Sequence, residues 1–170
     1  MSNLRGYLGL IALSAALAAC GGKKEEAAAP AEAPAAATSA AADTAAPAAA
    51  KIAADDVTTL DGTKFADMKG DAKHGEAVFT QCKTCHVIDP GVNRIGPSLH
   101  GIIGRKSGQI AGFSYSTANK ESGITWTPEK LYQYLEKPAR VVPGTKMAFA
   151  GLPKGQDRAD VIAYLTDATK

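Results

Sequence analysis

Metal-binding and redox side chains are scarce in this chain. Only three cysteines and three histidines occur in 170 residues. Cys82 and Cys85 are closely spaced, but Cys20 lies far from them, and His74 and His100 have no paired partner. A structural zinc site needs two more ligands at short paired spacing, and a thioredoxin-like dithiol needs a βαβ context that the flanking residues lack. The sequence therefore argues against both kinds of site.

Other familiar patterns are missing as well. The chain has no internal repeat, no Gly-rich phosphate loop and no basic-aromatic pattern typical of nucleic-acid binding. It also has no alternating apolar run long enough to predict a β-strand. These absences argue against a repeat protein, a phosphate-loop protein and a nucleic-acid partner, and they favour helices joined by loops.

The two neighbouring cysteines belong to the most informative motif, Cys82-Lys83-Thr84-Cys85-His86. A Cys-x-x-Cys-His sequence is the attachment pattern of a c-type haem. The two thiols add to the vinyl groups of the porphyrin, and His86 supplies the first axial ligand of the iron. The motif predicts one covalently bound haem c and an exported protein, because this attachment takes place outside the cytoplasm.

The N-terminus is typical of an export signal. Arg5 supplies a positive charge, and the apolar core that begins at Leu8 is too short for a membrane span, which needs about 20 apolar residues. Leu17-Ala18-Ala19-Cys20 resembles the lipobox of bacterial lipoproteins. That resemblance implies removal of the signal peptide, residues 1–19, and acylation of Cys20. The alternative is an ordinary signal peptide with a chance cysteine.

Residues 20–56 read as a lipid-anchored linker that precedes a folded domain over 57–170. The linker is rich in alanine, with scattered prolines and almost no large apolar residue to bury. Residues 21–54 would span ~30–35 Å as a flexible coil and up to ~105 Å as a polyproline II chain. Either reach would let a small domain move between partners in the membrane.

Three helices are predicted in the folded domain. The first covers about 71–80, with Asp71 as its cap. The second begins with Thr127 as N-cap and Pro128 at the first helical position, and a later proline ends it. The third covers about 156–168, where apolar residues recur on one side. The expected fold is a small all-α domain whose long loops wrap around one covalent haem.

The sixth position of the iron decides between electron transfer and ligand binding. The domain offers His74, His100, Met68, Met147 and the lysines as candidates. Met147 is favoured because it lies in a turn-rich loop between the second and third helices, far from His86 in sequence. The alternative is that the methionine only fills a gap in the core.

Longer stretches resemble the class I c-type cytochromes, which include mitochondrial cytochrome c and bacterial cytochrome c2. The matching stretches follow the family's order across about residues 70–168. They are Gly96-Pro97-Ser98-Leu99-His100-Gly101, Gly112-Phe113-Ser114-Tyr115, Ala118-Asn119-Lys120, Gly123-Ile124-Thr125-Trp126, Pro143-Gly144-Thr145-Lys146-Met147, Phe149-Ala150-Gly151 and Ile162-Ala163-Tyr164-Leu165. A match this extended is more specific than the haem motif alone.

The resemblance implies a role for each matching residue. His86 and Met147 would be the axial ligands, and the carbonyl of Pro97 would accept the other ring proton of His86. The other implied contacts with the cofactor are Arg105, Tyr115 and Trp126 at the haem propionates, Asn119 and Thr145 in a polar network near Met147, and Phe149 over the haem. The alternatives are that Tyr115 and Trp126 only fill the core and that Arg105 is a solvated surface cation.

The resemblance also has implications for packing, and the chain departs from it in one loop. Gly75 would allow the first and third helices to cross closely. The segment between His86 and Gly96 is one residue shorter than in mitochondrial forms, and a histidine common there is absent. His100 is expected to be structural or exposed to solvent.

The expected function is electron transfer rather than catalysis. The resemblance implies a monomeric carrier between membrane-bound complexes. The donor would be a bc-type quinol-oxidising complex, and the acceptor a haem-copper oxidase or a photosynthetic reaction centre. The alternative is a haem peroxidase or small-ligand binder with an opened Met147 side. Peroxidases of this type usually carry two haem motifs, and this chain has one.

Charge and export together give the expected surroundings. Residues 57–170 carry 15 Lys+Arg and 11 Asp+Glu, which favours acidic partners. The alternative is that the surface lysines only keep the domain soluble. The lysines expected to line a docking rim are Lys83, Lys106, Lys120, Lys137, Lys146 and Lys154. The protein is expected on a membrane facing the periplasm, with the inner membrane favoured by function and the outer membrane possible.

Overall fold

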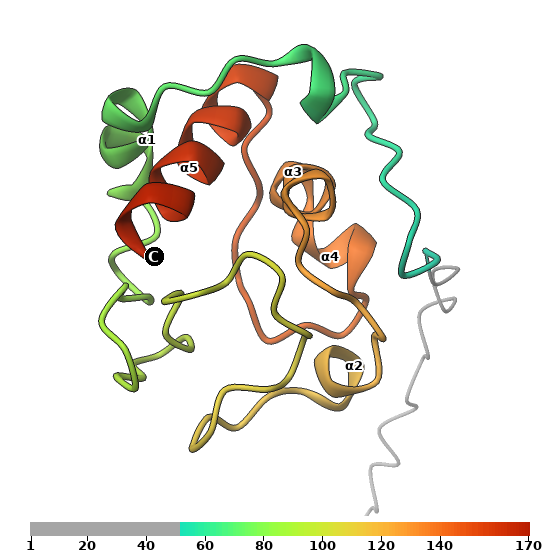
Figure 1. The fold of residues 1–170 in the computed structure, drawn as a ribbon. Coiled ribbons are helices and arrows are strands. Elements are labelled where there is room, and N and C mark those ends of the chain that lie inside the picture. The colour runs from blue at the N-terminus through green and yellow to red at the C-terminus, as the bar shows by residue number, and fades with distance from the viewer. Residues whose placement is uncertain (1–51) are drawn as a thin grey trace, which may run out of the picture. The chain divides into compact units, whose positions relative to one another are not determined.

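Helices and long loops make up residues 52–170, the part of the chain that this computed structural model describes (Figure 1). The helices are η1 (Phe65–Asp67), α1 (Ala72–Phe79), α2 (Thr117–Lys120), α3 (Pro128–Glu136), α4 (Pro138–Val141) and α5 (Gly155–Ala168). An isolated antiparallel bridge between Lys106 and Thr125 is the only β pairing recorded among the described residues. The all-α prediction is confirmed. The predicted signal peptide, Cys20 and most of the linker lie outside the described residues.

The three predicted helices correspond to α1, α3 and α5, and the shorter elements were not predicted. Four-residue and three-residue helices carry too few positions for an apolar repeat to be recognised. The α3 helix ends at Glu136, and α4 begins directly afterwards with Pro138 at its first position. Proline ends one helix and starts the next because it lacks an N–H but has a helical φ. Within residues 52–170, no helix has the length and apolar character needed to span a membrane.

The two terminal helices pack against each other, as Figure 1 shows for α1 and α5. Asp71 caps α1 with its side chain. A side chain at Gly75 would overlap the backbone carbonyl of Asp160, so glycine is needed for this close approach. The rings of Phe79 and Tyr164 meet with their centroids 5.2 Å apart. This crossing holds the end of α1, and the motif that follows it, against α5.

The loop that follows the haem motif is held by an amide. Asn93 donates from Nδ2 to the carbonyl of Ala111 at 3.0 Å and accepts the backbone N–H of Ser98 at 3.1 Å. One side chain therefore joins the shortened loop to a loop 18 residues later. Asn93 therefore cross-links this segment, although the histidine that is common in this loop of mitochondrial forms is absent.

The chain before α1 also belongs to the packed structure. The Nζ atom of Lys130 in α3 is buried and donates to the carbonyls of Ala53 and Asp56. These hydrogen bonds extend the packed region to residues before 57, where the sequence predicts the domain to start. Alanine and proline dominate the composition up to this point, so composition alone does not show the boundary.

Candidate functional site

A cavity of about 430 Å³ opens between the helices and the loops. It is lined by residues from the segment that follows α1, from α2, α3 and α5, and from the loops between them. All eleven residues that the sequence assigns to the cofactor lie on its wall. They are Cys82, Cys85, His86, Pro97, Arg105, Tyr115, Asn119, Trp126, Thr145, Met147 and Phe149.

The histidine side of the cavity is arranged for ligation through one ring nitrogen. Nδ1 of His86 lies 2.8 Å from the carbonyl oxygen of Pro97. A carbonyl can only accept, so Nδ1 carries the proton and Nε2 keeps its lone pair. Burial lowers the pKa of His86, which keeps the ring neutral. A side chain at Gly96 would overlap this ring, so glycine makes room for it.

The two thiols on the same wall are suited to attachment rather than to redox or zinc chemistry. Cys82 and Cys85 are both free and partly buried. Burial, followed by the nearby Cys85, raises the pKa of the Cys82 thiol to about 11. Redox-active dithiols have lowered thiol pKa values instead. Among residues 52–170 no group of three or more His, Cys, Asp or Glu side chains is placed to hold a metal ion.

The methionine side is built from the segment of residues 142–154, which we call the Met147 loop. The Sδ atom of Met147 accepts a hydrogen bond from the hydroxyl of Tyr134 at 3.2 Å. The backbone N–H of Met147 donates to Oγ1 of Thr145 at 3.2 Å, and Nδ2 of Asn119 donates to the same oxygen at 3.3 Å. The thioether therefore faces the cavity within a connected set of hydrogen bonds.

Tyr134 is a functional residue that the sequence does not reveal. The sequence places it on the apolar face of the second helix, as part of the core. Its ring does pack on Trp126, with centroids 4.7 Å apart. Burial raises the pKa of Tyr134 to about 12, so the hydroxyl stays protonated and donates to Met147. A buried tyrosine hydroxyl needs a hydrogen-bond partner. This requirement is the one feature of the sequence that could have indicated a polar contact for Tyr134.

Arg105 presents a cation to the cavity. It donates from Nη1 to the carbonyl of His100 at 2.8 Å and from Nη2 to that of Ser98 at 3.0 Å. Burial lowers the pKa of Arg105, but a guanidinium remains charged at neutral pH. Burial also raises the pKa of Tyr115. The N–H groups that Arg105 does not use on carbonyls are suited to bind carboxylates such as haem propionates.

Apart from Lys146, the competing candidates for the sixth ligand do not line the cavity. Of the histidines and methionines in residues 52–170, only His86 and Met147 line the cavity. His74 is mostly exposed, and its Nδ1 atom lies 2.7 Å from Oδ2 of Asp160. The six lysines predicted to form a docking rim are all exposed, and Lys146 also lines the cavity.

Comparison with known proteins identifies the family. A scan against protein-family models matches residues 72–169 to the family described as "Cytochrome c". The chain belongs to the cytochrome c family. It is 53% identical to cytochrome c type-1 of Ascaris suum over 103 residues, which cover 60% of this chain and 92% of that protein. It is 53% identical to cytochrome c of Gibberella zeae, over 59% of this chain and 97% of that protein. It is 51% identical to cytochrome c of Arabidopsis thaliana, over 61% of this chain and 94% of that protein.

A cytochrome c of this family binds one covalent haem c and transfers single electrons. The donor set on the cavity wall fits that group, because it combines two thiols, an imidazole nitrogen with a free lone pair and a thioether. The bound haem supplies an iron that alternates between the ferric and ferrous states. Cys82 and Cys85 would hold the porphyrin, and His86 and Met147 would hold the iron.

We expect Tyr134→Phe to lower the reduction potential of this cytochrome while Met147 stays on the iron. The hydroxyl withdraws electron density from the sulfur, which disfavours the ferric state. A hydrogen bond of this kind contributes about 0.5–1.5 kcal/mol, which is roughly 20–65 mV for one electron. Redox titration measures the change, and Tyr164→Phe is the control because its ring packs on Phe79 and does not line the cavity. An unchanged potential in Tyr134→Phe would contradict a role for this hydrogen bond.

Proposed function

We propose that this cytochrome carries electrons between membrane-bound complexes, from a bc-type quinol-oxidising complex to a haem-copper oxidase or a photosynthetic reaction centre. The observation that carries the proposal is that His86 and Met147 both line the same cavity. Two protein ligands close the iron to small molecules, which favours electron transfer over ligand binding. Because the sulfur is a neutral donor, the potential is expected to be high.

A basic rim guides the partners to the haem edge. Lys83 follows Cys82 directly, and Lys146 lines the cavity next to Met147, so both lie beside the cofactor site. The surplus of basic residues over 57–170 attracts acidic partner faces and speeds encounter at low ionic strength. The other lysines of the proposed rim are Lys106, Lys120, Lys137 and Lys154.

Rapid-mixing measurements of electron transfer with a purified bc-type complex and oxidase test the partner proposal. We expect fast reaction at low salt that slows as salt rises, because the attraction between the partners is screened. Lys83→Glu and Lys146→Glu should each slow the low-salt reaction roughly tenfold. Lys64→Glu, at an exposed position outside the proposed rim, is the matched control. Rates that do not depend on salt, or equal losses in all three variants, would contradict the proposal.

A lipid anchor at Cys20 keeps the carrier at its partners' membrane. The lipobox-like sequence is the support for this part of the proposal. Two or three acyl chains anchor a protein stably, whereas a single chain binds only marginally. The linker would then give the domain its reach along the periplasmic face, with the inner membrane favoured because respiratory complexes lie there. The similarity to the relatives named above supports the haem domain and does not test the anchor.

Membrane fractionation tests the anchor. We expect Cys20→Ser to release a soluble cytochrome with an unchanged spectrum, because Cys20 lies outside the haem motif. Separation of inner from outer membranes in the unmodified strain assigns the location. Retention of the Cys20→Ser protein on the membrane would overturn the proposed anchor.

A further inference from the structure

The segment of residues 53–63, which we call the N-terminal belt, lies before the region that matches the family and is bound to α3. The buried ammonium of Lys130 donates to the carbonyl of Ala53 at 3.1 Å, to that of Asp56 at 2.6 Å and to Oε1 of Gln133 at 2.8 Å. Nε2 of Gln133 donates to Oδ1 of Asp56 at 3.1 Å. Every donor position of the ammonium is used, so this part of the belt is firmly held.

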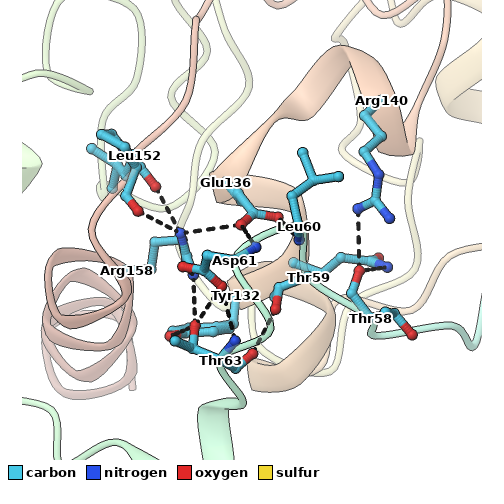
Figure 2. A network of polar contacts seen from close by, with 12 residues as sticks. Thr58, Thr59, Leu60, Asp61, Thr63, Tyr132, Glu136, Arg140, Leu152 and Arg158 are labelled. Carbon is cyan, nitrogen blue, oxygen red and sulfur yellow. Dashed lines mark hydrogen bonds and ion pairs between the residues drawn. The ribbon is translucent and has the colours of Figure 1, made fainter.

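The second half of the belt binds a fully buried guanidinium, that of Arg158 in α5 (Figure 2). Nη2 of Arg158 donates to Oδ2 of Asp61 at 2.6 Å and to Oγ1 of Thr63 at 3.0 Å. The carboxylate of Glu136, at the end of α3, lies 3.7 Å from Nη1. It also accepts the backbone N–H groups of Leu60 at 2.6 Å and Asp61 at 3.0 Å. The belt therefore supplies one of the two carboxylates near Arg158.

The same guanidinium holds the C-terminal end of the Met147 loop. Nη1 of Arg158 donates to the carbonyl of Leu152 at 3.0 Å and to that of Pro153 at 3.2 Å. The backbone N–H of Leu152 donates in turn to the carbonyl of Leu135 in α3 at 2.7 Å. Arg158 thus connects the belt to a point five residues after Met147.

The charge balance makes this connection sensitive to Asp61. A buried cation that loses its partner is strongly destabilised, because its remaining contacts do not replace the lost charge. Burial acts to raise the pKa of Asp61, but hydrogen bonds from Thr63 and Arg158 outweigh it and hold the pKa well below its usual value. Asp61 is therefore ionised at neutral pH. Without it, Arg158 would keep only the more distant carboxylate of Glu136.

We propose that Asp61 and Arg158 are positioning residues for Met147, and that the N-terminal belt holds the Met147 loop closed over the haem. The inference rests on the proposed ligation of the iron by Met147. A closed loop keeps the thioether on the iron and keeps small molecules away from it. The belt thereby preserves electron transfer through a segment that never touches the cofactor cavity.

The test uses the full-length ferric holoprotein and its Asp61→Ala variant. Cyanide binds the ferric iron only after the sulfur of Met147 leaves, so its limiting binding rate reports loop opening. We expect this rate to rise roughly tenfold, since Asp61 is partly exposed and water replaces part of the lost charge. We also expect faster amide hydrogen exchange at Leu152, with unchanged exchange at Gly96, whose N–H is bonded to Cys85 on the histidine side.

Matched variants separate this role from general stability. Asp56→Ala removes another belt carboxylate that does not contact Arg158, so it should leave both readouts unchanged. In Asp61→Glu, which keeps the charge, the cyanide-binding rate and the amide exchange should match those of the unmodified protein. Asp61→Asn, which keeps the shape, should change both readouts in the same direction as Asp61→Ala but by less. Equal effects in Asp61→Ala and Asp56→Ala, or equally faster exchange at Leu152 and Gly96, would overturn the inference. If the unmodified protein lacks the sulfur-to-iron band, the proposed ligation fails, and the exchange contrast still decides whether the belt holds the loop.

Discussion

Replacing Met147 with leucine is expected to turn a closed electron carrier into a haem protein that binds small ligands. Leucine has a similar volume but no donor atom, so the iron loses its sixth protein ligand. In the unmodified protein, cyanide can bind only the open state, in which the sulfur has left the iron, and such minor states have populations of about 0.1–10%. Removing the sulfur should therefore raise the apparent cyanide affinity roughly 10–1000-fold. The sulfur-to-ferric-iron absorption band should vanish, and the reduction potential should fall.

Met68→Leu is the matched control for this change. Met68 lies on the described part of the chain but does not line the cavity. We expect its spectrum, potential and cyanide affinity to match those of the unmodified protein. A Met147→Leu protein that kept a high potential and resisted cyanide would show that another group fills the sixth position.

The second large effect is expected from the double variant Cys82→Ala/Cys85→Ala, which should lose covalent haem and, without haem, fail to fold. The cavity of about 430 Å³ is lined by apolar and aromatic side chains, such as Leu131 and Trp126, which water would contact if the haem were absent. Because a small domain is stable by only about 5–15 kcal/mol, losing this much apolar burial is expected to unfold it. The haem therefore supplies a part of the core that residues 57–170 cannot replace.

Two measurements check this expectation. Haem staining after denaturing electrophoresis reports covalent attachment, and thermal unfolding followed by circular dichroism reports whether the haem-free chain unfolds cooperatively. Cys20→Ala provides the control for loss of a cysteine, and it should keep both haem and fold. A cooperatively folded haem-free chain would contradict the view that the cofactor completes the core.

Local features of the sequence predicted the parts of the fold that depend on local contacts. Asp71 and Thr127 accept hydrogen bonds as N-caps, and Pro128 stands at the first position of α3. The haem motif specifies its chemistry within five residues, so it could be recognised without a structure. Met147 could be predicted as a ligand only from its loop and from the family resemblance. In sequence, a ligand methionine cannot be told from one that fills the core.

Features that depend on contacts distant in sequence could not be predicted. The hydroxyl of Tyr134 finds Met147 only after α3 and the Met147 loop come together. In the N-terminal belt, Asp61 contacts Arg158, which lies 97 positions later in the sequence. No short-range pattern marks such pairs, and the alanine-rich composition before residue 57 conceals the start of the belt.

His86 and Met147 are expected to hold the iron of a single haem c together. The most direct measurement is the visible and near-infrared absorption spectrum of the purified full-length ferric protein, recorded before and after addition of cyanide at modest concentration. We expect a low-spin spectrum with a sulfur-to-ferric-iron band near the red end, and no rapid change on adding cyanide. A high-spin spectrum without that band, with rapid binding of cyanide, would contradict it.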